Sequence, residues 1–497
     1  MKHISKILLT IIGLSLVLSS LAQVPDTGHW SVTWKTFNMT GPMMEQVGRV
    51  KTLNTKDLPH GNWSVGCETL DRDYADFSKY KPWMGELGAR SARIQSGWAK
   101  SEPKKGKYDF AWLDEIVNGL IEEGVTPWVC LGYGNPIYGA EKSLGSKIFS
   151  DEPTMKAWLK YVKATVSHYK DRVHEWEIWN EPNLGDDINN AETYASLASK
   201  TIDVIKEVQP NAVIIVGALS RMPLKFTNEM LEYFQEAGQL DKIDYLSFHP
   251  YFENPDDATS GIYDLRFLVD KFRPEIKLFM GECGCPANLE WGHALRYHQW
   301  TEISQAKWVA RRMMGDWSMG IRCSIFTMVD LQYTNLQQSF GLLRTNLLND
   351  VIYERPTYHT FRNIVNLFTP DITPCSDIEY RVNTYRDLKL TGVLKAGKQI
   401  GAVMWFGDKV PNDSLTYDDI DLYIKGFELK EPVWVDLITG RIYSIKRFRG
   451  DIMSGYQKFT GLQIWDSPML LIDRGSLPEA TKVERNIQGG SVKDMKY

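Results

Sequence analysis

Cysteine is scarce in this chain of 497 residues, which contains only six. Small secreted scaffolds that depend on disulfides are much richer in cysteine, so the count excludes a fold of that kind. Four of the six lie in predicted strands, where a free cysteine acts as a small buried hydrophobe: Cys67, Cys130, Cys283 and Cys323. Cys283 and Cys285 lack a second pair at zinc-site spacing, so we predict no metal there.

Strong net charge and long apolar runs are also missing. The net charge is −5 and the isoelectric point is near 6.1, which gives no reason to expect nucleic acid or an anionic membrane as partner. After the N-terminus no segment approaches the roughly 20 apolar residues that span a bilayer, so we expect no membrane span. Nine histidines without paired ligand spacing give little support to a metal-dependent enzyme.

The first 22 residues have the pattern of a secretory signal. Lys2 and Lys6 precede an apolar run from Ile7 to Leu18, and small residues follow around Ser20 and Ala22. An uncleaved signal anchor is the alternative. No cysteine follows the expected cleavage site, which argues against a lipid anchor. We therefore expect a soluble protein that is secreted or periplasmic.

Aromatic residues, in contrast, are plentiful, with 17 Trp and 23 Tyr. Exposed aromatic rings stack on the flat C–H faces of sugars, so this abundance is compatible with a glycan as partner. Packing in the core is the alternative explanation for many of these rings.

Strand and helix signals alternate from about residue 60 to 370. The segment 110–124 illustrates the helices, because Leu113, Ile116, Val117 and Leu120 share one face and Gly124 follows as a C-cap. Eight strand–helix units in series predict an α/β fold with a closed (β/α)₈ TIM barrel. An open doubly wound sheet would normally carry a glycine-rich phosphate loop after its first strand, and the sequence GCETLDRD is not such a loop. The predicted strands span 63–70, 89–98, 126–133, 173–181, 212–220, 243–251, 277–284 and 322–331.

The pattern changes beyond Pro370, where short alternating strands follow one another without helices. We predict an accessory antiparallel β-sandwich over 371–480, after a catalytic barrel over 60–370. Residues 1–22 form the signal, 23–59 an N-terminal segment and 481–497 a polar tail. Within the N-terminal segment, residues 30–37 alternate in a way that would add a strand to the sandwich.

Two carboxylates stand at the ends of predicted barrel strands. Glu181 ends the fourth strand and Glu282 lies near the end of the seventh, and the active site of such a barrel is built at these C-terminal ends. A facing pair suits glycoside hydrolysis, in which one carboxyl is protonated and the other ionised. A spacing of about 5–5.5 Å goes with retention and about 6.5–9.5 Å with inversion. Barrel geometry favours the shorter spacing, and the alternative role for either residue is a structural ion pair.

The segment Trp179-Asn180-Glu181-Pro182-Asn183 resembles the Asn-Glu-Pro signature of clan A, the retaining (β/α)₈ glycoside hydrolases. The segments GWAKSEPKKGKYDFAWLD (97–114) and SFHPY (247–251) are also similar to clan A enzymes, and family 39 is the nearest family. The resemblance implies that Glu181 is the acid/base and Glu282 the nucleophile, without metal or cofactor. It covers about 60–370, and two departures bear on the substrate: Gly-Glu-Cys around Glu282, and Phe326 where many relatives keep a Trp.

Further residues at the strand ends are candidates for substrate binding. Asn180 would donate to the sugar 2-hydroxyl, and Glu177 would pair with a buried base such as Arg93. The expected partner is an oligosaccharide or polysaccharide, and a catalytically silent glycan-binding barrel is the alternative. The sequence leaves open the sugar, the linkage, exo or endo action and the oligomeric state. The substrate-binding candidates are Asn180, Arg93, His249, Tyr251, Trp98, Tyr133, Asn135 and Trp291, with Asp330 a weaker one.

Overall fold

The computed structural model describes residues 41–184, 189–426, 428–451, 453–478 and 480–482. The predicted signal (1–22), the predicted strand over 30–37 and nearly all of the polar tail lie outside these residues. None of the helices within the described ranges is both long enough and apolar enough to cross a bilayer.

Eight parallel strands form a closed barrel, in which the first strand pairs with the eighth. The predicted (β/α)₈ architecture is confirmed, and the closure excludes the open sheet. The eighth strand is shorter than predicted, because the chain leaves the barrel after Ile325. The strands are β2 (Trp63–Gly66), β3 (Ser91–Gln95), β4 (Thr126–Leu131), β5 (Glu175–Ile178), β6 (Val213–Ser220), β7 (Tyr245–His249), β8 (Lys277–Cys283) and β9 (Arg322–Ile325).

Amphipathic helices surround the barrel, each after its strand. In α5 the face predicted from the sequence is buried, and Gly124 follows the helix with φ +81°, a conformation that favours glycine. The helices are α3 (Phe77–Leu87), α4 (Trp98–Ser101), α5 (Ala111–Glu122), α6 (Glu152–Tyr169), α7 (Ala191–Val208), α8 (Leu224–Glu236), α9 (Ala258–Phe272), α10 (Glu302–Ser318) and α11 (Pro356–Leu367). Short 3₁₀ helices are η1 (Thr55–Asp57), η2 (Leu70–Arg72), η3 (Pro136–Tyr138), η4 (Leu240–Lys242), η5 (Pro255–Asp257) and η6 (Arg474–Ser476).

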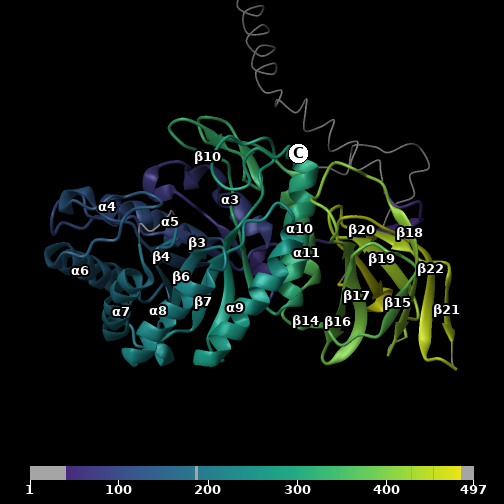
Figure 1. Ribbon diagram of the computed structural model, residues 1–497. Coiled ribbons are helices and arrows are strands. Elements are labelled where there is room, and N and C mark those ends of the chain that lie inside the picture. Colours follow the sequence, from purple (N-terminus) through teal and green to yellow (C-terminus); the bar gives the residue numbers. More distant parts are fainter. Residues whose placement is uncertain (1–40, 185–188, 427, 452, 479, 483–497) are drawn as a thin grey trace, which may run out of the picture.

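Two hairpins follow β9 before the last barrel helix. They pair β10 (Leu331–Gln332) with β11 (Gln337–Gln338), and β12 (Leu343–Thr345) with β13 (Val351–Glu354). Figure 1 shows β10 above the barrel, on the side of the C-terminal ends of its strands.

The C-terminal region forms two antiparallel sheets, as the sandwich prediction required. The larger has the order β14-β16-β17-β23-β19-β20-β1-β24 and the smaller β15-β18-β22-β21. A strand from the N-terminal segment, β1 (Gln46–Val50), pairs with β20 and β24. The others are β14 (Ile372–Cys375), β15 (Tyr380–Val382), β16 (Leu388–Lys395), β17 (Lys398–Phe406), β18 (Asp418–Lys425), β19 (Pro432–Asp436), β20 (Arg441–Ser444), β21 (Phe448–Asp451), β22 (Tyr456–Ile464), β23 (Met469–Asp473) and β24 (Ala480–Lys482).

The sandwich packs against the barrel through α10 and α11, which lie between the two domains in Figure 1. Arg311 of α10 donates from Nη1 to the carbonyl of Lys409 at 2.8 Å. Asn363 of α11 donates from Nδ2 to the carbonyl of Ile438 at 2.9 Å. Buried polar contacts of this kind fix one relative position, because breaking them would leave donors without partners.

Candidate active site

A cavity of about 940 Å³ opens at the C-terminal ends of the barrel strands. Both predicted carboxylates, Glu181 and Glu282, line it. Ligand sites in proteins are typically concave spaces of about 300–1,000 Å³, so this cavity is at the upper end of that range.

Glu181 follows β5 in a constrained backbone. Its φ is +45° and that of Trp179 is +64°, both in the left-handed region that non-glycine residues rarely adopt. The amide of Glu181 donates to the carbonyl of Ala218 at 2.8 Å, and Asn183 bonds the backbone of Ser220 on the adjacent strand. These bonds offset the cost of the conformation and direct the Glu181 carboxyl into the cavity.

Glu282 lies near the end of β8 between two donors. Arg93 Nη1 donates to Oε2 at 2.7 Å, and the Tyr251 hydroxyl donates to Oε1 at 2.9 Å. Burial, followed by the nearby charge of Glu282, raises the pKa of Tyr251 well above its usual value, so the phenol keeps its proton. Both donors stabilise the ionised form of Glu282.

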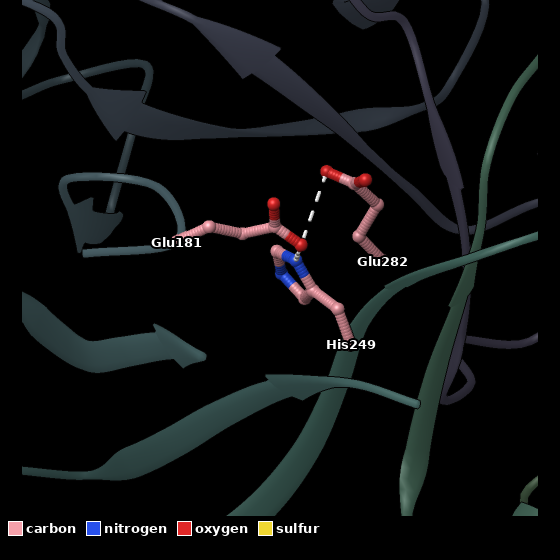
Figure 2. Close-up of side chains that lie close together, drawn as sticks. All are labelled: Glu181, His249 and Glu282. Atoms are coloured by element: carbon pink, nitrogen blue, oxygen red, sulfur yellow. Dashed lines mark hydrogen bonds and ion pairs between the residues drawn. The ribbon is translucent and has the colours of Figure 1, made fainter. Parts of the chain in front are cut away.

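His249, at the end of β7, connects the two carboxylates. Its Nδ1 lies 3.0 Å from Glu181 Oε1 and 4.0 Å from Glu282 Oε2 (Figure 2). Burial opposes the charged imidazole, but Glu282 and the hydrogen bond with Glu181 outweigh it, so the pKa of His249 is raised. The imidazole of His249 therefore holds a proton more readily than a free histidine does.

Arg93, on β3, organises the floor of the cavity. It is fully buried and donates to Glu177 Oε2 from Nε at 2.8 Å, so the predicted pairing of Glu177 with Arg93 is present. Its Nη2 also donates to Asn180 Oδ1 at 2.6 Å. The Asn180 amide nitrogen then donates to the Tyr133 hydroxyl at 3.0 Å, which leaves its second hydrogen for a ligand.

The spacing of the Glu181 and Glu282 carboxylates bears on two possible uses of the site, the binding of a cation and glycoside hydrolysis. One carboxylate oxygen of Glu181, one of Glu282 and a ring nitrogen of His249 all lie within 4.8 Å of one another. A divalent cation accepts such donors, but the permanent charge of Arg93 lies 2.7 Å from Glu282 Oε2 and opposes it. The spacing is close to the 5–5.5 Å of retaining glycosidases and well below that of inverting ones.

Comparisons with known proteins agree with this geometry. Residues 93–277 match the model of glycosyl hydrolases family 39. A family 39 glycoside hydrolase from the gut symbiont Bacteroides cellulosilyticus WH2 superposes with a TM-score of 0.63 at 19% identity, over 86% of this chain and 83% of that one. The superposition shows that the chain has the same fold as this family 39 enzyme.

Two other similar proteins extend the comparison. A monomeric β-xylosidase from Caulobacter crescentus CB15 superposes with a TM-score of 0.54 at 14% identity, over 86% of this chain and 98% of that one. The aryl-phospho-β-D-glucosidase BglA of Bacillus subtilis (strain 168) is 21% identical over 256 residues, which is 50% of this chain and 52% of the relative. The match therefore spans about half the length of that curated relative.

Within this barrel, the predicted site residues fall into two groups. The residues that line the cavity are Asn180, Glu181, His249, Tyr251, Tyr133 and Glu282. Arg93 does not line it but contacts Glu282 and Asn180 from below. Trp291 is 73% exposed beside Tyr297, with ring centroids 6.2 Å apart, and only Tyr297 lines the cavity.

Two predicted substrate-binding residues and the weaker candidate are placed away from the cavity wall. Trp98 is fully buried and stacks on Tyr138 at 5.3 Å, because the chain turns into α4 at this residue and directs the ring into the core. Asn135 caps η3 and donates to the carbonyl of Glu102 at 2.9 Å. Asp330 pairs with Arg355 in the interior, which is a structural role.

The cavity also has lining residues that the sequence reading did not select. Glu68 and Thr69 follow β2, and Arg72 lies in η2 over the Tyr133 ring. The predicted first strand ran to residue 70, so Glu68 was placed inside it, whereas β2 ends at Gly66 and Glu68 follows its end. Phe326, noted as a departure from many relatives, lines the cavity after β9.

Proposed function

We propose that this protein is an exported retaining β-glycosidase in which Glu181 is the acid/base and Glu282 the nucleophile. The observation that carries the proposal is the short spacing of the two carboxylates, with oxygens within 4.8 Å at the mouth of a clan A barrel. This spacing supports retention, because inverting enzymes hold the two carboxyl groups about 6.5–9.5 Å apart to admit a water.

The first step transfers the sugar to the enzyme. Glu181 donates its proton to the glycosidic oxygen while Glu282 Oε attacks the anomeric carbon. The bond between that carbon and the leaving oxygen breaks, the leaving group departs as an alcohol, and a glycosyl ester of Glu282 remains. Asn180 Nδ2 would donate its second hydrogen to the sugar 2-hydroxyl, a contact that strengthens in the transition state.

The second step releases the sugar. Glu181, now ionised, takes a proton from water, and the water oxygen attacks the anomeric carbon as the ester bond to Glu282 breaks. Loss of the Glu282 charge in the ester removes the first of the influences that raise the pKa of His249.

The β configuration is proposed because the named relatives are a β-xylosidase and an aryl-phospho-β-D-glucosidase. The cavity of about 940 Å³ supports a substrate with more than one sugar unit, since it is large for a single ring. We therefore propose an oligosaccharide or polysaccharide substrate.

Export is proposed from the basic, apolar and small-residue pattern of residues 1–22. Expression of the full chain in a bacterial host, followed by mass spectrometry of the fractions, tests it. We expect a shortened protein in the periplasm or medium, and full-length protein confined to the cytoplasm would contradict export.

The test of the reaction compares wild type and Glu282→Ala on a panel of aryl β- and α-glycosides, with and without azide. We expect one β-glycoside to be cleaved by wild type only, and azide to restore turnover of the variant as an α-glycosyl azide. An active variant without azide would exclude Glu282 as nucleophile. Cleavage of only the α-glycosides would refute the β configuration.

A further inference from the structure

Four buried polar atoms on the cavity wall have no hydrogen-bond partner within the described part of the chain. They are Glu68 Oε2, Thr69 Oγ1, His249 Nε2 and Gln338 Oε1. An unsatisfied buried polar group costs about 1–3 kcal/mol, so such groups usually have a partner in the working state. Two of them, on Glu68 and Thr69, are consecutive in the chain and belong to no step of the proposed reaction.

Glu68 is held beside the proposed nucleophile. Its Oε1 accepts from Arg93 Nη1 at 3.1 Å, and the same nitrogen donates to Glu282 Oε2 at 2.7 Å. Gly66 leaves room for this arrangement, because a Cβ at that position would lie 3.1 Å from both Cγ and Oε1 of Glu68. The carboxyl of Glu68 is therefore fixed, with one oxygen on Arg93 and the other at the cavity wall.

A purely structural role as counterion does not explain this arrangement. Glu177 already pairs with Arg93 from the interior and does not line the cavity. Burial raises the pKa of Glu68 to about 7. The positive charge of Arg93 acts in the opposite direction, and the negative charges of Glu282 and Glu177 add to the increase. The carboxyl is thus available near neutral pH both as a hydrogen-bond acceptor and, when protonated, as a donor.

We propose that Glu68 and Thr69 bind a ring hydroxyl of the sugar unit that Glu282 attacks. The hydroxyl would supply the missing hydrogen-bond partner of Glu68 Oε2 and Thr69 Oγ1. Arg93, which contacts both Glu68 and Glu282, would fix the position of the Glu68 carboxyl relative to the nucleophile. This inference rests on the proposed function, and it adds two substrate-binding residues after β2 that select the hydroxyl pattern of the sugar.

The experiment measures kcat/KM of wild type, Glu68→Gln, Glu68→Ala and Thr69→Val on the cleaved aryl glycoside and on each of its monodeoxy analogues. Glu177→Gln is the matched control, because it also removes a carboxylate from Arg93 but does not reach the cavity. Melting temperatures show that each variant is folded. Binding of 1-deoxynojirimycin and its xylose-configured analogue, measured by calorimetry, gives a second readout independent of turnover.

We expect Glu68→Ala to lower kcat/KM about 10- to 100-fold on the parent glycoside, with a smaller loss for Thr69→Val. On one monodeoxy analogue the wild type should lose a similar factor, and the Glu68 variants should lose nothing further. The Glu177 control should reduce turnover of all analogues by the same factor.

Two results would overturn the inference and leave the proposed function standing. An equal loss of the Glu68 variants on every analogue, as in the control, would show that Glu68 acts only through Arg93. Unchanged kinetics and unchanged inhibitor binding in both Glu68 variants would show that it does not meet the sugar. If wild type neither cleaves a glycoside nor binds either inhibitor, the proposed function fails and the inference fails with it.

Discussion

Arg93 Nη1 donates to Glu282 Oε2 at 2.7 Å from a side chain that is completely buried. The same guanidinium contacts Glu68, Glu177 and Asn180, so one planar group connects three carboxylates and one amide. Its pKa stays high because Glu177 and Glu68 outweigh the effect of burial. A fixed fork of five donors is what allows these bonds to be made at once.

Replacing Arg93 by lysine should therefore abolish most activity although the charge is kept. A lysine ammonium cannot contact four acceptors in this geometry, so Glu282 loses orientation and buried carboxylates lose donors. We expect kcat to fall by about 10²–10³ and the melting temperature to drop by several degrees. Steady-state kinetics and thermal unfolding measure both. A lysine variant with wild-type kcat would refute the role of Arg93.

Tyr251→Phe should affect catalysis without affecting stability. The variant removes the donor that lies 2.9 Å from Glu282 Oε1 and keeps the ring packed against its neighbours. We expect kcat to fall about 10- to 100-fold with KM nearly unchanged, because the lost bond stabilises the ionised nucleophile. The control is Tyr353→Phe. The hydroxyl of Tyr353 donates to Glu302 Oε1 at 2.7 Å, and Tyr353 does not line the cavity, so this variant should retain kcat. Equal effects of the two variants would contradict the assignment.

Glu68→Gln should change the pH dependence of stability. The folded pKa of Glu68 is about 7, above the ordinary value of 4.5. A raised acid contributes stability that is complete below its unfolded pKa and is lost as pH rises through the folded pKa. Wild type should therefore lose this contribution between about pH 4.5 and 7, whereas the glutamine variant cannot.

Thermal unfolding from pH 4.5 to 8.5 measures this difference. We expect the two proteins to melt alike near pH 4.5, and the variant to melt higher at pH 8 by on the order of 5 °C. A constant difference across the range would mean that Glu68 does not titrate within it.

The sequence was sufficient to predict that Glu181 and Glu282 meet in one cavity, because barrel polarity is a strong constraint. Strands in a parallel barrel all end at one mouth, so the residues after β5, β7 and β8 must meet there. The same reading failed for Trp98, since no strand-end rule shows that the chain turns directly into α4 and directs the ring onto Tyr138. It also missed Glu68, whose place depends on the space left by Gly66 and on the bond to Arg93.

Asp330→Asn should reduce stability and leave catalysis intact. Asp330 accepts from Arg355 Nη2 at 2.9 Å and from the Gly341 amide at 3.1 Å, all in the interior. Removing one charge of a buried pair costs about 3–5 kcal/mol when the other charge is left alone. Arg355 keeps Glu302 at 3.2 Å as a second partner, so we expect the cost to lie at or below the lower end of that range. We expect a clear fall in melting temperature and unchanged kcat/KM of the folded fraction.

The matched control for Asp330 is Asp350→Asn. Asp350 pairs with Lys79 at 2.7 Å on the surface, where both side chains are 44% exposed. Solvent screens such a pair, so its loss should leave the melting temperature nearly unchanged. Loss of kcat/KM in folded Asp330→Asn would instead restore Asp330 as a site residue.

The β-sandwich should influence which substrates are cleaved, because its residue Val410 lines the cavity. The segment that carries Val410 is fastened to the barrel: Arg311 donates to the carbonyl of Lys409 at 2.8 Å, and Asn254 donates to that of Gly407 at 3.0 Å. Val410→Trp should therefore fill space at the mouth rather than move away. We expect kcat/KM to fall about tenfold or more for a trisaccharide and to change little for a small aryl glycoside, since only the longer substrate needs that space.

The control is Val382→Trp, a half-buried sandwich position that does not line the cavity. Equal losses on long and short substrates, or the same selectivity change in the control, would show that the sandwich supports the barrel without shaping its substrate choice.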